Sequence, residues 1–488
     1  MKQVLSVFLV LTTTIFYAQQ AIESKELNTE IQTIENSLVP RIVLAGEEIP
    51  AMKLDDRMKT LNVPGVSVAV FKDGKIRWAR GYGVANSESG TMVDTNTLFQ
   101  AGSISKPVAA LAILKLVDEG KADLDVDVNT YLTDWKVPET EFTETEKVTL
   151  RRLLTHTAGT TVHGFPGYKQ TDNFPSDVEV LNGKGNTDVI TVDTEPGTNW
   201  RYSGGGYTIM EKVVEDISGM TLADYSARYI LPAMGMSNST FEQPLSAKWH
   251  DQASAAYDHE GNLIEGLWNN YPEQAAAGLW TTPIDLAKYC MEVQQIMSGK
   301  EDGVLSRQTI EKMLTKHERD WGLGPSLRKE GDSLMFGHGG KNAGFSNNMA
   351  AFAYQGHGVI VMTNADNGTS LMGEVIRAVS DYYGWDMAKP EIIKTIDLSE
   401  EALRSFTGNF KMNEQVPGVG DYLVEINTKD RKLIVTDKIT GEVLTFYPVS
   451  DHEFREINDG DYLAFKKDDQ GTMVEFTYNN RYVFDRTD

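Results

Sequence analysis

The chain has 488 residues, which is long enough for two or more structural units. Its hydrophobic content of 41% and charged content of 24% are typical of a folded globular protein. The formal net charge of −24 argues against a nucleic acid or an anionic membrane surface as a partner, and the single cysteine excludes an internal disulfide.

Residues 1–18 have the pattern of a secretory signal peptide. Lys2 is followed by the apolar run VLSVFLVLTTTIF and then by Tyr17-Ala18-Gln19. The apolar run is short for a membrane-spanning helix, so we expect no stable membrane anchor after cleavage. An exported protein without disulfides fits the periplasm of a bacterium or secretion from it.

Residues 65–86 predict two strands joined at Asp73-Gly74. Residues 97–120, TLFQAGSISKPVAALAILKLVDEG, predict a helix that is apolar on more than one face and therefore buried. Ser103 and Lys106 lie three positions apart at its start, on one helix face. A buried lysine amine can lose its proton and then accept the proton of a serine hydroxyl. A second S-x-x-K, Ser326 to Lys329, has no buried helix behind it, and we attribute it to chance.

The middle of the chain predicts mostly helices and one long loop region over residues 161–200. Residues 275–297 predict a turn and then an amphipathic helix with Thr282 as its N-cap and Cys290 buried in it. His156 and His163 are separated by seven residues across a glycine turn, which is no recognised spacing for metal ligands. We expect structural roles for both histidines, and no metal or cofactor.

From residue 334 the pattern changes to successive strands, followed by an amphipathic helix over residues 371–383. Strands on both sides of a long helical insert predict an α/β (α+β) fold, an antiparallel sheet covered by helices. After Pro390, eight short strands predict a small β-barrel or sandwich. We place the boundary between the domains so that residues 19–396 form the first and residues 397–488 the second.

Three motifs occur in order along the first domain: Ser103-Ile-Ser-Lys106, Tyr202-Ser-Gly204 and His338-Gly339-Gly340. Over about residues 45–385 the chain resembles the penicillin-recognising serine hydrolases, which include class C β-lactamases, D-Ala-D-Ala carboxypeptidases, D-amino-acid peptidases and esterases. Their motifs are S-x-x-K, Y-x-N, and K-T-G or H-x-G. The resemblance extends to the segments TLFQAGSISKP, LLTHTAG, YSGGGY, AAAGLWTTPIDLA and GHGGKNAGF. Residues 397–488 resemble the lipocalin-like domains appended to some members.

The resemblance implies a β-lactamase-like fold and a site for a small-molecule or peptide substrate. Ser103 would form an acyl-enzyme, and Lys106 and Tyr202 would share its proton, either of them being the base. His338 would line the cleft. The backbone N–H groups of Ser103 and Lys341 would form the oxyanion hole. The substrate-binding strand would contain His338, Gly339, Gly340 and Lys341.

Two departures from the family pattern bear on the substrate. Gly204 replaces the asparagine of Y-x-N, and the His338 motif replaces the lysine of K-T-G. Both favour a peptidase, amidase or esterase over an efficient β-lactamase. Because a histidine has an ordinary pKa of about 6.5, we expect His338 to attract substrate carboxylates near pH 6 but not at pH 8. The alternative function is a penicillin-binding sensor that is acylated but turns over poorly.

Overall fold

The computed structural model describes residues 24–487, with gaps at 302, 414–419, 459, 469 and 471. The predicted signal peptide lies outside the described residues. By its internal contacts the chain divides into two compact units. The first contains Leu54–Met372 and residues up to Ile31, and the second contains Gln32–Lys53 and residues from Gly373 onward. The predicted boundary at residues 396/397 follows strand content rather than contacts, and it stays a prediction.

An antiparallel sheet organises the first unit, and seven of the described strands belong to it in the order β4-β3-β2-β10-β9-β8-β7. These strands are β2 (Gly65–Lys72), β3 (Lys75–Asn86), β4 (Thr91–Met92), β7 (Ser326–Arg328), β8 (Met335–Asn342), β9 (Phe345–Phe352) and β10 (Gly358–Thr363). The central strands β2 and β10 are buried along almost their whole length, and helix α9 (Pro283–Met297) packs against both. The predicted antiparallel sheet covered by helices is confirmed.

Helix α3 (Ser105–Asp118) lies in the core of this unit. All of its residues except Lys115, Val117 and Asp118 are buried, which confirms the expected buried helix. It packs against α6 and α8. Further helices of the unit include α2 (Leu54–Thr60), α4 (Leu150–Leu154), α5 (Asp177–Leu181), α6 (Gly204–Ser218), α7 (Leu222–Tyr225), α8 (Gln274–Ala277) and α10 (Arg307–Met313), and α11 (Gly368–Tyr383) continues into the second unit.

Two glycines allow the segment before α3 to lie against β8. A Cβ atom on Gly340 would lie 1.9 Å from the carbonyl oxygen of Ala101, and one on Gly102 would lie 2.5 Å from the amide nitrogen of Lys341. Gly102 also has a φ of +54°, a conformation that glycine adopts without strain. The start of α3 therefore approaches the end of β8 at backbone distance.

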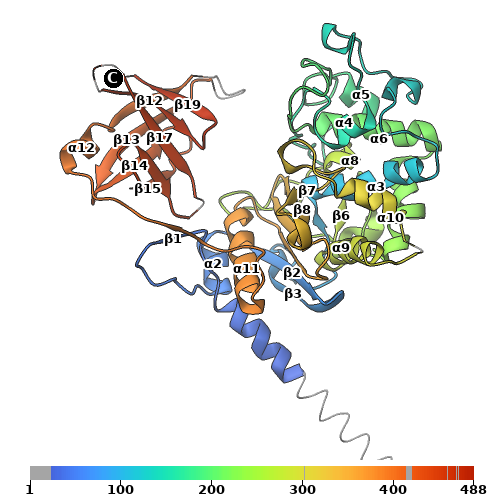
Figure 1. Ribbon diagram of the computed structural model, residues 1–488. Coiled ribbons are helices and arrows are strands. Elements are labelled where there is room, and N and C mark those ends of the chain that lie inside the picture. The colour runs from blue at the N-terminus through green and yellow to red at the C-terminus, as the bar shows by residue number, and fades with distance from the viewer. Residues whose placement is uncertain are drawn as a thin grey trace, which may run out of the picture. The chain divides into compact units, whose positions relative to one another are not determined.

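The second unit contains a closed barrel of eight described strands, each paired with the next in the chain and β12 with β19 (Figure 1). The predicted small barrel or sandwich is therefore a barrel. Its interior is filled by apolar side chains, among them Phe406, Phe410, Phe454, Phe465 and Phe476. The strands are β12 (Gly408–Met412), β13 (Leu423–Lys429), β14 (Lys432–Asp437), β15 (Val443–Pro448), β16 (Glu453–Glu456), β17 (Tyr462–Lys467), β18 (Met473–Tyr478) and β19 (Tyr482–Arg486).

The rest of the second unit is small. Strand β1 (Ile42–Leu44) pairs in parallel with β11 (Glu391–Ile393), and helix α12 (Glu400–Arg404) precedes the barrel. Across the residues that the structure describes, in either unit, no helix has the length and apolar character needed to cross a membrane.

Candidate active site

Ser103 lies in a single 3-10 turn, η1 (Gly102–Ile104), directly before α3. Its side chain is not a helix cap, because the cap positions are Ala101 and Ile104 and neither uses a side chain. The Ser103 Oγ atom instead lies 3.0 Å from Nζ of Lys106. Ser103 is partly exposed whereas Lys106 is buried, so a substrate can reach the hydroxyl but water has little access to the amine.

The environment of Lys106 favours a neutral amine. Its Nζ atom donates to the carbonyl oxygen of Ala276 at 2.8 Å and lies 5.0 Å and 5.6 Å from the ring centres of Tyr202 and Tyr207. Burial away from water lowers the pKa of Lys106 to about 7. Near neutral pH a large fraction of the amine is therefore free to accept the Ser103 proton.

Tyr202 stands at the start of α6, where the next residue, Ser203, caps the helix by accepting from the amide of Gly206. Burial raises the pKa of Tyr202 well above its usual value of 10, and a hydrogen bond with the Ser103 hydroxyl opposes that rise only in part. The phenol therefore keeps its proton through the physiological range, which makes it a proton donor rather than a base in the resting site.

His338 on β8 is a neutral neighbour of Tyr202. Its Nδ1 atom lies 2.5 Å from the carbonyl oxygen of Gly339, which can only accept, so the ring proton is on Nδ1. Nε2 is then an acceptor, 3.4 Å from the Tyr202 hydroxyl. Burial, with a smaller contribution from Lys106, lowers the pKa of His338 to about 3. The expectation that His338 becomes charged near pH 6 is therefore wrong, because a sequence does not reveal how deeply a strand residue is buried.

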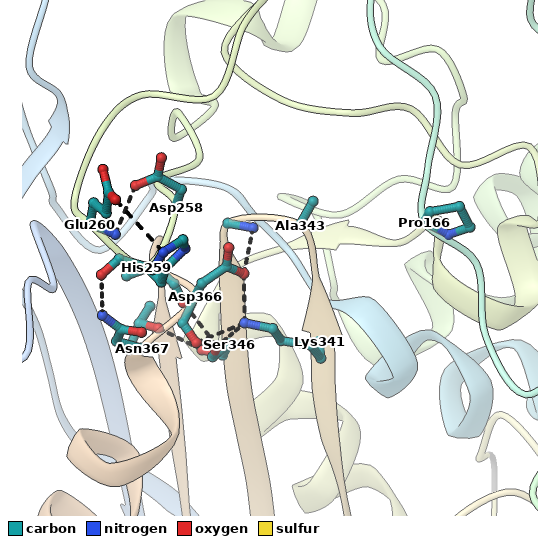
Figure 2. A network of polar contacts seen from close by, with 12 residues as sticks. Pro166, Asp258, His259, Glu260, Lys341, Ala343, Ser346, Asp366 and Asn367 are labelled. Atoms are coloured by element: carbon teal, nitrogen blue, oxygen red, sulfur yellow. Dashed lines mark hydrogen bonds and ion pairs between the residues drawn. The ribbon is translucent and has the colours of Figure 1, made fainter. Parts of the chain in front are cut away.

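The other residues predicted on this strand have different surroundings. A Cβ atom on Gly339 would meet nothing within 4 Å, so this position faces open space. The backbone of Lys341 lies beside Gly102, but its side chain points to Asp366 and Ser346 (Figure 2). Lys341 Nζ contacts Asp366 Oδ1 at 2.6 Å and Ser346 Oγ at 3.2 Å. The cation of Lys341 is thus already paired with a carboxylate.

Gly204 replaces an asparagine of the family pattern for a structural reason. A Cβ atom there would lie 2.9 Å from the ring of Phe165 and 3.1 Å from the carbonyl oxygen of His163. The amides of Gly204 and Gly205 donate to the carbonyls of His163 and Val162, both at 3.0 Å. This loop occupies the space of an asparagine side chain and satisfies the free amides at the start of α6.

A polar network fixes the elements around the nucleophile. Asn342 at the end of β8 donates to Gln100 Oε1 at 2.9 Å and to the carbonyl oxygen of Ala277 at 3.1 Å. Gln100, in the short strand β5 (Phe99–Gln100) paired with β6 (Trp280–Thr281), donates to the carbonyl oxygen of Asn269 at 2.6 Å. Buried amide contacts of this kind restrain their partners strongly. Gln100 and Asn342 carry no motif by which the sequence would have revealed them.

Aromatic rings surround Tyr202, and sequence reasoning missed their place in the site. The ring centres of His156 and His163 lie 4.2 Å and 4.9 Å from that of Tyr202. Trp321 lies 5.8 Å from Tyr202 and 5.4 Å from His338. His156 belongs to the segment LLTHTAG that carried the family resemblance, which was the one available signal.

The described residues contain no group of three or more histidine, cysteine, aspartate or glutamate side chains placed to hold a metal ion. The structure thus brings together Ser103, Lys106, Tyr202 and His338, with the backbone of Lys341 alongside. The second S-x-x-K begins on the edge strand β7 (Ser326–Arg328) and ends just after it, so Ser326 and Lys329 share no helix face. The assembled groups can support nucleophilic attack by a hydroxyl, with a neutral amine as base and a phenol as acid.

Comparison with protein families gives a match to the beta-lactamase model over residues 52–383. A curated protein of Staphylococcus aureus (strain MRSA252) named teichoic acid D-alanine hydrolase is 25% identical over 248 residues. That stretch is 50% of this chain and 58% of the relative, so the chain spans little more than half the length of the curated relatives it matches.

Solved structures share the fold at lower identity. The octameric penicillin-binding protein homologue from Pyrococcus abyssi has a TM-score of 0.60 at 22% identity, covering 88% of this chain and 98% of that one. The D-alanine carboxypeptidase from Burkholderia cenocepacia has a TM-score of 0.53 at 19% identity, covering 66% and 95%. At these identities the likeness concerns the fold alone.

Proposed function

This chain belongs to the beta-lactamase family, and we propose that it is a serine hydrolase that forms an acyl-enzyme on Ser103 while cleaving an ester or amide whose leaving group carries no carboxylate. The family membership supports the reaction class. The observation that carries the restriction on the leaving group is the neutral, hydroxyl-free strand at His338 and Gly339.

In acylation, Ser103 Oγ attacks the substrate carbonyl carbon as its proton passes to the neutral Lys106 amine. The 3.0 Å contact puts Oγ and Nζ within reach for proton transfer, and the lowered pKa of Lys106 supports the direction toward the amine. We place the oxyanion at the backbone amides of Ser103 and Lys341. When the bond to the leaving group breaks, Tyr202 gives its hydroxyl proton to the departing oxygen or nitrogen, and the Lys106 ammonium returns a proton to Tyr202.

Deacylation follows the same path in reverse. Water attacks the ester carbonyl of the acyl-enzyme and gives its proton to Lys106, and Ser103 Oγ leaves with a proton from the Tyr202–Lys106 pair. His338 does not exchange a proton in this cycle, because a pKa of about 3 keeps it neutral. Its Nε2 accepts from the Tyr202 hydroxyl, which holds the phenol in one orientation before the substrate arrives.

Recognition of a substrate carboxylate would need a cation or a hydroxyl on β8. The histidine in place of the lysine is uncharged, and Gly339 has no side chain at the position of the threonine. Lys341, which directly follows the motif, is paired with Asp366. A carboxylate placed here would lose its hydration without a charged partner in return, which disfavours penicillins and free C-terminal peptides.

The relatives suggest which acyl group to test first. One carries the name teichoic acid D-alanine hydrolase, and a solved structure of the same fold is a D-alanine carboxypeptidase. We extend this to D-alanyl esters and amides with a neutral leaving group as substrates of this chain. The predicted signal peptide supports a periplasmic or secreted location, where such conjugates of the cell envelope would be met.

A matched pair of D-alanyl esters tests the proposal, one with a carboxylate on the leaving alcohol and one with the corresponding carboxamide. We expect kcat/KM to be about tenfold or more higher for the carboxamide ester than for the carboxylate ester, and this ratio to be the same at pH 6 and pH 8. The double substitution His338→Lys and Gly339→Thr, which rebuilds the family motif, should make the kcat/KM values of the two esters similar, since position 339 has room for a side chain. A wild-type preference for the carboxylate would refute the proposal.

Intact-protein mass spectrometry during turnover separates an enzyme from a sensor. An acyl adduct on wild-type protein that disappears within the assay supports hydrolysis. An adduct on Ser103 that persists after substrate removal would support the alternative of a penicillin-binding sensor.

A further inference from the structure

We infer that His156 is a positioning residue for Tyr202, one that acts on the reaction only through the tyrosine. Three contacts carry this inference. The carbonyl oxygen of His156 accepts from the amide of Arg201 at 2.8 Å, and its Nδ1 accepts from the amide of Ser203 at 3.1 Å. Its ring lies over the Tyr202 ring with centres 4.2 Å apart and planes 32° apart. One residue therefore holds the backbone on both sides of Tyr202 and the face of its ring.

The backbone of His156 is itself held in an uncommon conformation. Its φ is +60°, in the left-handed region that residues other than glycine rarely adopt. The residue follows Thr155, the C-cap of α4, and its amide donates to the carbonyl oxygen of Leu153 at 3.3 Å. Such a conformation costs about 1 kcal/mol and persists where the surroundings require it. Here it turns the ring out of the helix path and onto Tyr202.

The ring of His156 must stay neutral to do this. Nδ1 accepts a hydrogen bond, so the proton lies on Nε2, which is buried and has no hydrogen-bond partner among the described residues. The rings of Trp321, Tyr207 and Trp200 have centres 5.0 Å, 5.3 Å and 6.0 Å from it. The charged and titratable groups that face it are Lys106, His338 and His163, and a proton on any of them disfavours another on His156.

Positioning of Tyr202 has a chemical consequence. The phenol must point between Ser103 and the leaving group, and a small displacement of a proton donor costs much of its contribution to the rate. The ring of His156, only 2% exposed, also keeps water from one face of Tyr202, which helps to hold the tyrosine pKa high. The inference rests on the proposed role of Tyr202 as the proton donor.

Two substitutions separate the contacts of His156. His156→Asn tolerates the left-handed backbone and offers an oxygen to the amide of Ser203, but it has no ring. His156→Phe keeps a ring but loses the acceptor. We expect each to lower kcat on a D-alanyl ester by roughly tenfold or more with KM within about twofold of wild type. The matched control is His259→Asn, which makes the same change at a surface histidine of the first unit outside the site and should change kcat by less than about threefold.

A double-mutant cycle decides between positioning and mere support of the fold. In a Tyr202→Phe background, His156→Asn should lower kcat by no more than about twofold further, because the hydroxyl that it positions is absent. The same loss in both backgrounds would overturn the inference, as would a wild-type kcat in both His156 variants. If Tyr202→Phe alone kept full activity, the proposed role of the tyrosine would fail first, and the inference with it. His156→Phe provides the same cycle should His156→Asn not fold.

Discussion

The two units of this protein bury different kinds of side chain. The first unit buries ionisable side chains, among them Lys106, His156, His338, Tyr207, Glu211 and Glu273. The core of the barrel is a cluster of apolar side chains in which aromatic rings lie edge to face, for example Phe406 and Phe454 at 4.9 Å. Close packing of apolar side chains stabilises the barrel. Burial of ionisable groups in the first unit lowers its stability, because these groups lose contact with water.

The ionisable groups with the pKa shifts that acid–base catalysis needs lie in the first unit. Burial in the first unit lowers the pKa of Lys106 and raises that of Tyr202, and these are the shifts that a base and an acid of one site require. Among the described residues the apolar cluster of the barrel contains no amine or carboxylate, and the buried carboxylate of strand β16, Glu456, accepts from the side-chain amide of Asn458 at 2.7 Å. We therefore expect substitutions in the first unit to change rates, and substitutions inside the barrel to change stability.

The largest effect is expected for Ser103→Ala. Removal of the nucleophile should lower kcat on activated esters by at least about 10⁴-fold, because nucleophile and base act as one unit. The melting temperature should change little, since only a partly exposed hydroxyl is lost. Steady-state hydrolysis of nitrophenyl acetate, with thermal denaturation as the control, checks both. If this variant hydrolysed the ester at nearly the wild-type rate, Ser103 would not be the nucleophile, and the chemistry assigned to the first unit would be wrong.

Phe465→Ala tests the expectation that substitutions inside the barrel change stability. The Phe465 ring packs against Phe406, Phe454 and Phe476 at centre distances of 4.9, 5.7 and 5.3 Å, and its loss should cost the barrel about 3–5 kcal/mol. Chemical denaturation followed by far-UV circular dichroism measures the loss. Hydrolysis of a small ester should stay within about twofold of wild type. A parallel fall in kcat would show that the two units do not act independently.

Tyr202→Phe removes the phenolic oxygen and keeps the ring against His156. We expect kcat to fall by about 100-fold, the usual scale for a lost acid–base group. The measurement is a full kinetic curve on one ester, with KM as internal control. A change of only a few fold would reduce Tyr202 to part of the cleft wall.

Glu273→Gln tests whether buried charge weakens the first unit. Glu273 is fully buried and neither carboxylate oxygen has a partner among the described residues; burial raises its pKa to about 8. In the unfolded chain this group ionises near pH 4.5, so the folded state loses relative stability as pH rises from there to about 8. The variant should therefore be more stable than wild type by roughly 4 kcal/mol at pH 8 and similar to it at pH 4. Denaturation curves at both pH values measure the difference, and a variant less stable at pH 8 would contradict the prediction.

The smallest effect concerns the pH dependence of acylation. Lys106 must be neutral to act as base, and with a pKa of about 7 it should make kcat/KM for a neutral ester rise about tenfold between pH 6 and pH 8. His338→Lys places a cation nearby, which disfavours the charged form of Lys106 and should move the midpoint below 7. A pH profile of the variant beside wild type tests the shift. A flat wild-type profile would point to another base.

Much of this organisation was predictable from local patterns. The buried helix at residues 105–118 follows from its apolar composition, and the hairpin from Asp73-Gly74, whose φ values of 53° and 70° match a two-residue turn. Thr282 caps α9 as its position before Pro283 suggested, with its side chain accepting from the amide of Asp285. Cys290 is a buried free cysteine.

Other features were beyond a reading of local patterns. From the sequence we expected only structural roles for His156 and His163, whereas in the fold both rings pack against Tyr202. The replacement of asparagine by Gly204 has its reason in a loop that crosses the start of α6. In each case the deciding neighbour is distant in the chain, so no spacing rule could have revealed it.

By itself, the sequence determined the order of the motifs, the buried helix that follows the nucleophile and the strand-only pattern of the barrel, because periodicity, turn residues and caps act over a few positions. Only the tertiary structure decided the protonation states. The Lys106 amine donates to a carbonyl 170 positions away, and the Tyr202 hydroxyl meets a histidine 136 positions away. Whether such a group is charged depends on how completely water is excluded by elements from the whole first unit, and on the other bases enclosed with it.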